Sequence, residues 1–155
     1  MSGKAALSVE RILVPVDFSE TSEHAVDHAI ELAKTLGARI ELFHSYPSAP
    51  GSITPYGPVL PEGIYQAYRD SAEARVSQVR DRVAAAGVEV GAHLSSDVPS
   101  MAIVEAAKTL EVDLIVMGTR GLSGLKHVLL GSVAERTVRH AECPVLTVGT
   151  PSSSD

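Results

Sequence analysis

Short apolar runs alternate along the chain with longer segments in which apolar residues recur at helical spacing. A run with almost no polar alternation predicts a strand that is buried on both faces, as in a parallel sheet. Apolar residues three and four positions apart predict a helix with one face toward the core. The predicted strands are residues 11–17, 38–45, 88–94, 112–118 and 144–148, and the predicted helices are residues 19–37, 62–87, 99–111 and 132–140.

Two of the predicted helices carry boundary signals. Gly37 follows the first helical pattern and is expected to end it, whereas Pro99 stands where the first turn of a helix tolerates proline. The first helix should turn one apolar face to the core, formed by Val26, Ala29, Ile30, Ala33 and Leu36.

The regular order of strand and helix predicts a single α/β domain. Strands separated by helices form a parallel sheet with right-handed crossovers and with helices on both faces. Five strand units are too few for an eight-fold barrel, so we expect an open, doubly wound, Rossmann-like sheet. The domain spans residues 1–155, with its core in residues 10–149 and a frayed tail at residues 150–155.

The segment of residues 46–61 fits neither pattern. It contains five of the nine prolines in the chain, which predicts a long loop without regular structure. Loops of this length are uncommon in compact domains and usually serve as lids, binding loops or mobile excursions.

Charge and cysteine content narrow the classes of partner. A formal charge of −6 argues against nucleic acid, because phosphate backbones are bound by Lys and Arg patches. The chain has no apolar run of membrane-spanning length and no signal-peptide pattern at its start. The single cysteine, Cys143, fits a reducing compartment, so we expect a cytoplasmic protein that binds neither nucleic acid nor membrane.

A group of glycines follows the fourth predicted strand and suggests an anion site. Glycine lets the backbone take positive φ and approach a ligand closely, as Gly118 and Gly121 could do here. Gly131 and Ser132 stand at a predicted helix N-terminus, where unpaired N–H groups favour an anion. The alternative is that Ser132 only caps its helix, with Glu135 completing a capping box. Spacing alone leaves both alternatives open, and neither the P-loop nor the G-x-G-x-x-G pattern is present.

Asp17 ends the first predicted strand and also has two interpretations. Its carboxylate could accept hydrogen bonds from a ribose or from the edge of an adenine. Alternatively, Asp17 caps the following helix, with Glu20 three residues later as the partner in a capping box.

Taken together, the stretches "ILVPVDFSE", "GTRGLSGLKHVLLGSVAE" and "ECPVLTV" resemble the universal stress protein family. The resemblance extends over residues 11–148, apart from the proline-rich loop. The nucleotide-binding branch of that family is marked by the pattern G-x2-G-x9-G-[ST]. This sequence matches the pattern at Gly118, Gly121, Gly131 and Ser132.

The resemblance implies a sheet ordered 3-2-1-4-5 and an ATP site between the loops after the first and fourth strands. The residues implied to border the adenine and ribose are Pro15, Asp17, Ile40 and Met117. Those implied to wrap the phosphates from one side are Gly118, Arg120 and Gly121. Those implied to meet the phosphates at the helix N-terminus are Gly131, Ser132 and Val133. Mg²⁺ would accompany the triphosphate, held through the phosphates.

The resemblance also implies a homodimer through the last strand, residues 144–148. An apolar edge strand agrees with this, because an unprotected sheet edge invites pairing. Pro144 protects only the start of the strand.

These observations favour an ATP-binding regulator of a stress response. No carboxylate pair, Ser/His/Asp set or catalytic lysine is placed at the crevice, so ATP hydrolysis is expected to be slow at most. Two alternatives remain open: a true ATPase or phosphotransferase, and a ligand-independent dimeric interaction module.

Overall fold

The computed structural model describes residues 7–46, 62–120 and 130–150. Strands and helices alternate throughout this part of the chain, as the hydrophobic pattern predicts. The strands are β1 (Arg11–Pro15), β2 (Arg39–Ser45), β3 (Val90–Ser95), β4 (Leu114–Gly118) and β5 (Val145–Val148). The helices are α1 (Glu20–Leu36), α2 (Glu62–Ala85), α3 (Pro99–Thr109) and α4 (Ser132–His140).

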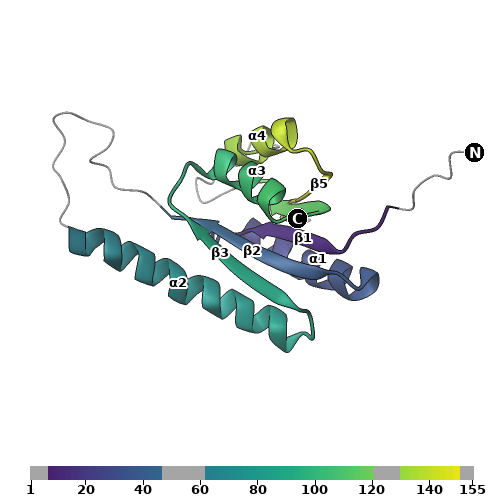
Figure 1. Cartoon of the computed structure of the whole chain (residues 1–155), viewed down its shortest axis with the longest axis horizontal. Helices are drawn as coiled ribbons and strands as arrows, with labels where there is room; N and C mark the ends of the chain where they lie inside the picture. Colours follow the sequence, from purple (N-terminus) through teal and green to yellow (C-terminus); the bar gives the residue numbers. More distant parts are fainter. Residues whose placement is uncertain (1–6, 47–61, 121–129, 151–155) are drawn as a thin grey trace, which may run out of the picture.

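The five strands form one parallel sheet in the order β3-β2-β1-β4-β5, which confirms the predicted topology. Ile12 of β1 lies between Ile40 of β2 and Leu114 of β4. Helices α1 and α2 cover one face of the sheet, and α3 and α4 cover the other (Figure 1). The doubly wound architecture is therefore confirmed.

Burial on both faces explains why β1 has no polar alternation. Ile12 and Val14 belong to the core beneath α1 and α2, whereas Leu13 belongs to the core beneath α3 and α4. All three side chains are fully buried. Because successive side chains of a strand point to opposite faces, a central strand with two covered faces must be apolar at every position.

Both ends of α1 are set by local chemistry. Ser19 is the N-cap, and its hydroxyl accepts the N–H of Ser22 at 3.3 Å. Gly37 adopts the left-handed conformation, with φ of 70°, and ends the helix as predicted. The expected apolar face is confirmed except at Leu36, which is 47% exposed.

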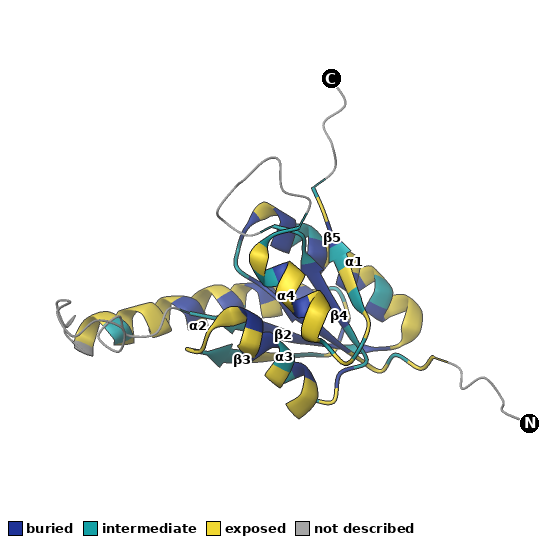
Figure 2. Ribbon diagram, turned by 90° about the horizontal axis from the view of Figure 1, so that it is seen from above, coloured by how far each residue is buried: buried dark blue, intermediate teal, exposed yellow. Residues whose placement is uncertain are grey.

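Helix α2 is only half covered. Its later turns bury Val76, Val79 and Val83 in the core beside β2 and β3, whereas its first turns are largely exposed (Figure 2). Among the helices of the described ranges, none combines the length and apolarity that crossing a membrane requires.

Gly118 allows α1 to pack closely against the end of β4. A Cβ at this position would lie 2.7 Å from Thr21 Oγ1 and 2.9 Å from the Thr21 backbone carbon. Real Cβ atoms essentially never approach a backbone atom this closely, so any side chain here would displace the first turn of α1. The glycine is therefore required by packing between the helix and the strand.

We expect Gly118→Ala to lower the free energy of unfolding by roughly 1–3 kcal/mol, the usual cost of overpacking a tight contact. Gly149→Ala is the matched control, because its Cβ would meet only Thr119 Oγ1 at an ordinary 3.7 Å. Urea unfolding of both variants measures the difference. If the two variants were equally stable, the contact between α1 and Gly118 would not exclude a side chain at position 118.

Candidate functional site

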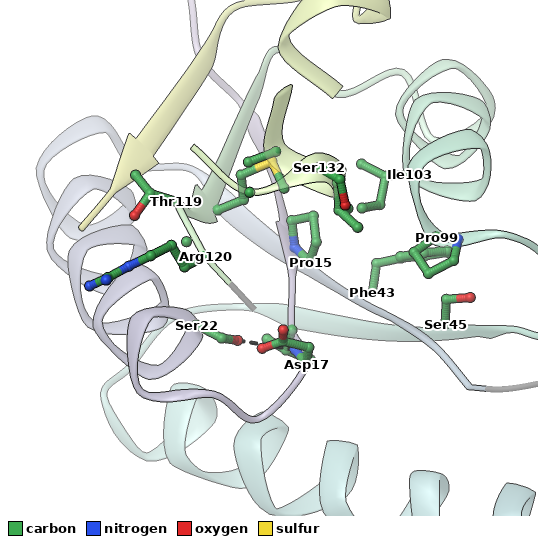
Figure 3. Close-up of a pocket in the computed structure, with 16 residues that line it drawn as sticks. Pro15, Asp17, Ser22, Phe43, Ser45, Pro99, Ile103, Thr119, Arg120 and Ser132 are labelled. Atoms are coloured by element: carbon green, nitrogen blue, oxygen red, sulfur yellow. Dashed lines mark hydrogen bonds between the residues drawn. The ribbon is translucent and has the colours of Figure 1, made fainter. Parts of the chain in front are cut away.

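A cavity of about 320 Å³ opens at the carboxyl ends of β1 and β4, beside the N-terminus of α4 (Figure 3). Its walls come from the ends of β1, β2 and β4 and from the first turns of α3 and α4. This is the place where the strand order reverses, because β1 is followed on one side by β2 and on the other by β4. Open α/β sheets bind ligands at such a point.

The cavity brings together most of the residues that the sequence singled out. Eight of the predicted site residues line it: Pro15, Asp17, Met117, Gly118, Arg120, Gly131, Ser132 and Val133. The ninth, Gly121, lies outside the described residues, as does almost all of the proline-rich loop. The tenth, Ile40, does not line the cavity.

Ile40, which the resemblance implied to border the ligand, does not line this cavity. Ile40 lies near the amino end of β2, is fully buried, and packs in the core beneath α1 and α2. Phe43 takes its place, because it lies opposite Pro15 near the carboxyl end of β2 and belongs to the other face of the sheet. The alternation of the strand contained this signal, since Phe43 and Ile40 differ by an odd number of residues.

Other residues of the cavity carried no sequence signal. Ser45 comes from the end of β2, and Pro99 and Ile103 come from the start of α3 (Figure 3). Pro99 and Ile103 approach the cavity because of the way α3 packs on the sheet, and no local sequence pattern predicts that packing. The remaining members are Val16, Ser22, Thr119 and Ala134.

Asp17 is held by the turn between β1 and α1. Its Oδ1 accepts the Ser19 N–H at 3.0 Å and the Ser19 hydroxyl at 2.5 Å, and its own N–H donates to Ser22 Oγ at 3.2 Å. The cap of α1 is therefore Ser19, and the predicted capping box of Asp17 with Glu20 is wrong. Asp17 supports the cap from outside the helix and lines the cavity at the same time.

The turn at Asp17 also contains a strained residue. Phe18 has φ of 66°, which is uncommon for a residue with a Cβ. Its ring lies 4.6 Å from the His44 ring, and the Arg75 guanidinium carbon stands 4.0 Å from the Phe18 centroid. His44 Nδ1 donates to the carbonyl of Val16 at 2.7 Å, and burial lowers the pKa of His44, which favours the neutral form of the ring.

The start of α4 does not follow the predicted capping box. The helix begins at Ser132, and Gly131 is the N-cap, with extended φ and ψ of −69° and 166° and with its carbonyl accepting the Glu135 N–H at 2.9 Å. The Glu135 carboxylate pairs with Arg139 at 2.6 Å. Ser132 is thus the first helical residue, exposed at the cavity, and its hydroxyl is not the cap.

Of the two described glycines of the motif, Gly118 does not have the positive φ expected of it, whereas Gly131 lies at the start of α4 as expected. Within residues 7–46, 62–120 and 130–150, the only glycines with positive φ are Gly37 and Gly87. Gly118 is required by its contact with Thr21, and Gly131 has an extended conformation that turns the chain into α4. Gly118 is therefore required by close packing and not by a left-handed backbone.

Arg120 lines the cavity, but its charge is directed elsewhere. Its guanidinium extends away from Pro15 and Phe43 and donates to Thr150 Oγ1 at 2.5 Å (Figure 3). Its carbonyl accepts a hydrogen bond from the Thr21 hydroxyl. Arg120 is therefore tied at both ends to neighbouring elements.

The cavity has two chemical regions. Pro15, Phe43, Ile103 and Met117 form an apolar slot, and the first turn of α4 supplies backbone N–H groups that have no partner within the helix. An apolar slot beside such a helix start suits a flat group joined to an anion. No group of three or more His, Cys, Asp and Glu side chains within the described part of the chain could hold a metal ion.

Comparisons with known proteins agree with this geometry. The model of the universal stress protein family matches residues 8–149. The universal stress protein MJ0531 of Methanocaldococcus jannaschii is 35% identical over 146 residues, covering 92% of this chain and 83% of the relative.

Two solved structures have the same fold as this chain and are 27% and 29% identical to it in sequence. The structure of the protein MJ0577 has a TM-score of 0.82 at 27% identity and covers 94% of this chain and 99% of its own. A universal stress protein in complex with cAMP has a TM-score of 0.70 at 29% identity and covers 93% of this chain and 99% of its own. With the family model spanning nearly the whole sequence, the chain belongs to the universal stress protein family.

Proposed function

We propose that this protein binds an adenine nucleotide, ATP with Mg²⁺, in the cavity between β1, β4 and α4, and that it acts as a nucleotide-dependent regulator of a stress response. The observation that carries the proposal is the convergence of Asp17, the apolar slot and the start of α4 on one cavity. The apolar slot suits a base, Asp17 suits a ribose, and the start of α4 suits phosphates.

The phosphate side of the proposal rests on α4. Unpaired N–H groups and the helix dipole concentrate positive potential at a helix N-terminus. The Ser132 hydroxyl is exposed at the cavity and is free of the capping role that the sequence suggested for it. It can therefore donate to a phosphate oxygen without loss to the helix.

The base side of the proposal rests on the slot. Phe43, Pro15 and Met117 are buried in the chain and present apolar surface to the cavity, which suits the faces of a purine. Asp17 lies at one end of this slot, and a carboxylate there accepts hydrogen bonds from ribose hydroxyls or from an amino group. The related protein that is known in complex with cAMP binds a ligand with the same three parts.

Mg²⁺ fits this site through the nucleotide rather than through a protein cage. Asp17 is the one carboxylate that lines the cavity among the described residues, and its Oδ1 already accepts two hydrogen bonds. Mg²⁺ commonly keeps several waters and binds substrate phosphates with few protein ligands. When bound, the ion would screen the charge of the phosphates.

The same arrangement argues for slow turnover. No second carboxylate or histidine of the described chain lines the cavity to activate water, and the Arg120 guanidinium points to Thr150. A site that holds ATP without rapid hydrolysis suits a regulator whose bound nucleotide persists. The single cysteine of the chain supports a cytoplasmic setting for it.

We also propose a homodimer through residues 144–148. Strand β5 is an edge of the sheet, and it pairs with β4 on one side only. Leu146 is 41% exposed on this strand, and Val138 of the adjacent α4 is 48% exposed. An edge with exposed apolar side chains gains from pairing with a second copy.

Nucleotide binding is tested directly on the purified protein. Heat denaturation should release adenine nucleotide into the supernatant, and calorimetry of nucleotide-free protein with Mg-ATP should show saturable binding. Folded protein that neither carries nor binds an adenine nucleotide would contradict the proposal.

Ser132→Ala separates the two roles considered for this hydroxyl. We expect the free energy of unfolding to stay within about 0.5 kcal/mol of the wild type, because Gly131 and not Ser132 is the cap. We expect the Kd for Mg-ATP to rise about ten- to a hundredfold through loss of one hydrogen bond to a charged group. A variant that is destabilised but binds ATP normally would return Ser132 to a structural role.

The proposed dimer is tested by the substitution Leu146→Arg. The control is Met101→Arg, because Met101 is also an exposed apolar residue but lies on α3, away from β5. Sedimentation velocity should show a dimer for the wild type and the control and a monomer for Leu146→Arg, since a charge at the paired edge opposes its symmetric copy. A monomeric wild type, or a dimer that tolerates this change, would rule out the β5 interface.

A further inference from the structure

The first turn of α1 is bonded to the loop that follows β4. Thr21 is 5% exposed, and its hydroxyl donates to the carbonyl of Arg120, 99 residues away in sequence. Hydroxyls near the start of a helix usually bond to their own backbone. This one reaches a different segment, and that segment lines the cavity.

The bonded segment is connected in turn to the start of α4. The Thr119 N–H donates to the Val148 carbonyl at 2.9 Å, and the Thr119 carbonyl accepts the Gly131 N–H at 2.6 Å. The Arg120 carbonyl that Thr21 holds is therefore one residue from the group that fixes Gly131, the N-cap of α4. A displacement of Arg120 would reach the N–H groups at the helix start.

The first turn of α1 holds the opposite wall of the cavity as well. The Ser19 hydroxyl donates to Asp17 Oδ1, and the Thr21 hydroxyl donates to Arg120. A hydroxyl has a single proton, so the 3.4 Å contact between the Ser19 and Thr21 oxygens carries no hydrogen bond while both of these bonds are made. The two walls are thus joined by the rigid helical turn and not by a chain of shared protons.

We propose that Thr21 is a positioning residue that sets the affinity of this site for the phosphates of its ligand. Through the Arg120 carbonyl it holds the segment of residues 118–120, and through Thr119 it holds the first turn of α4. The base lies in the slot of Pro15, Phe43 and Met117, with which Thr21 makes no hydrogen bond. The effect of Thr21 is therefore confined to the phosphate side. This inference rests on the nucleotide site proposed above.

The test compares ATP with adenosine, which shares the base and sugar but lacks phosphate. Thr21→Val keeps the shape of the side chain and removes the donor, so the Kd for Mg-ATP should rise about five- to tenfold while that for adenosine changes less than about twofold. Thr21→Ser keeps the hydroxyl and should restore ATP binding. Thr35→Val is the matched control, because Thr35 is in the same helix and its hydroxyl donates to Glu31 on the exposed side.

Hydrogen exchange of the ligand-free protein gives a second measurement. The Gly131 amide should exchange faster in Thr21→Val than in the control, because its acceptor is no longer fixed through Arg120. Thr21→Ala removes the hydroxyl without placing a methyl group against the carbonyl, and it replaces Thr21→Val if that variant does not fold.

The outcomes separate this inference from the proposed function. Equal losses for ATP and adenosine, unchanged ATP binding in Thr21→Val, or no rescue by Thr21→Ser would each overturn the role of Thr21 and leave the nucleotide site standing. A wild type that binds neither ligand would overturn the proposed function, and the inference with it.

Discussion

The reversal of strand order at β1 is the constraint on which the rest of this structure depends. Strand β1 is bonded to β2 on one side and to β4 on the other, and the helices that follow β1 and β4 pack on opposite faces of the sheet. Because α1 and α4 lie on opposite faces, neither helix covers the edge of the sheet between the ends of β1 and β4. A cavity at this edge is therefore a consequence of the topology, and any chemistry that the loops carry is brought to it.

The first turn of α1 turns this general crevice into a defined site. Gly118 lets the helix approach the end of β4, and the contact places Thr21 against the Arg120 carbonyl. From the other side of the same turn, Ser19 fixes the Asp17 carboxylate. A single helical turn thus sets the spacing between the two walls, and its rigidity comes from packing that is unrelated to the ligand.

The family assignment and the geometry support each other at different levels. Membership in the universal stress protein family rests on a match over nearly the whole chain and on an archaeal relative of 35% identity. The proposal of an ATP-binding regulator rests on the cavity, with Ser132 exposed at the start of α4 and Asp17 at the end of the slot. A fold alone does not assign a ligand, and the convergence of these groups is what favours a nucleotide over an interaction module without a ligand.

The sequence by itself determined the strands, the helices and the parallel, doubly wound class, because the period of apolar residues reflects local backbone geometry. The order of the strands came from the family resemblance. The sequence also singled out Gly118, Gly131 and Ser132, which line the cavity, and their role in binding an anion stays a prediction. What only the tertiary structure decided are the contacts across elements. Alternation places Ile40 and Phe43 on opposite faces of β2, but only the packing of the helices shows which face carries the cavity. The capping alternatives considered for Asp17 and Ser132 are wrong, because the backbone places the caps at Ser19 and Gly131. The role of Thr21 depends on a partner 99 residues away, which no local pattern could reveal.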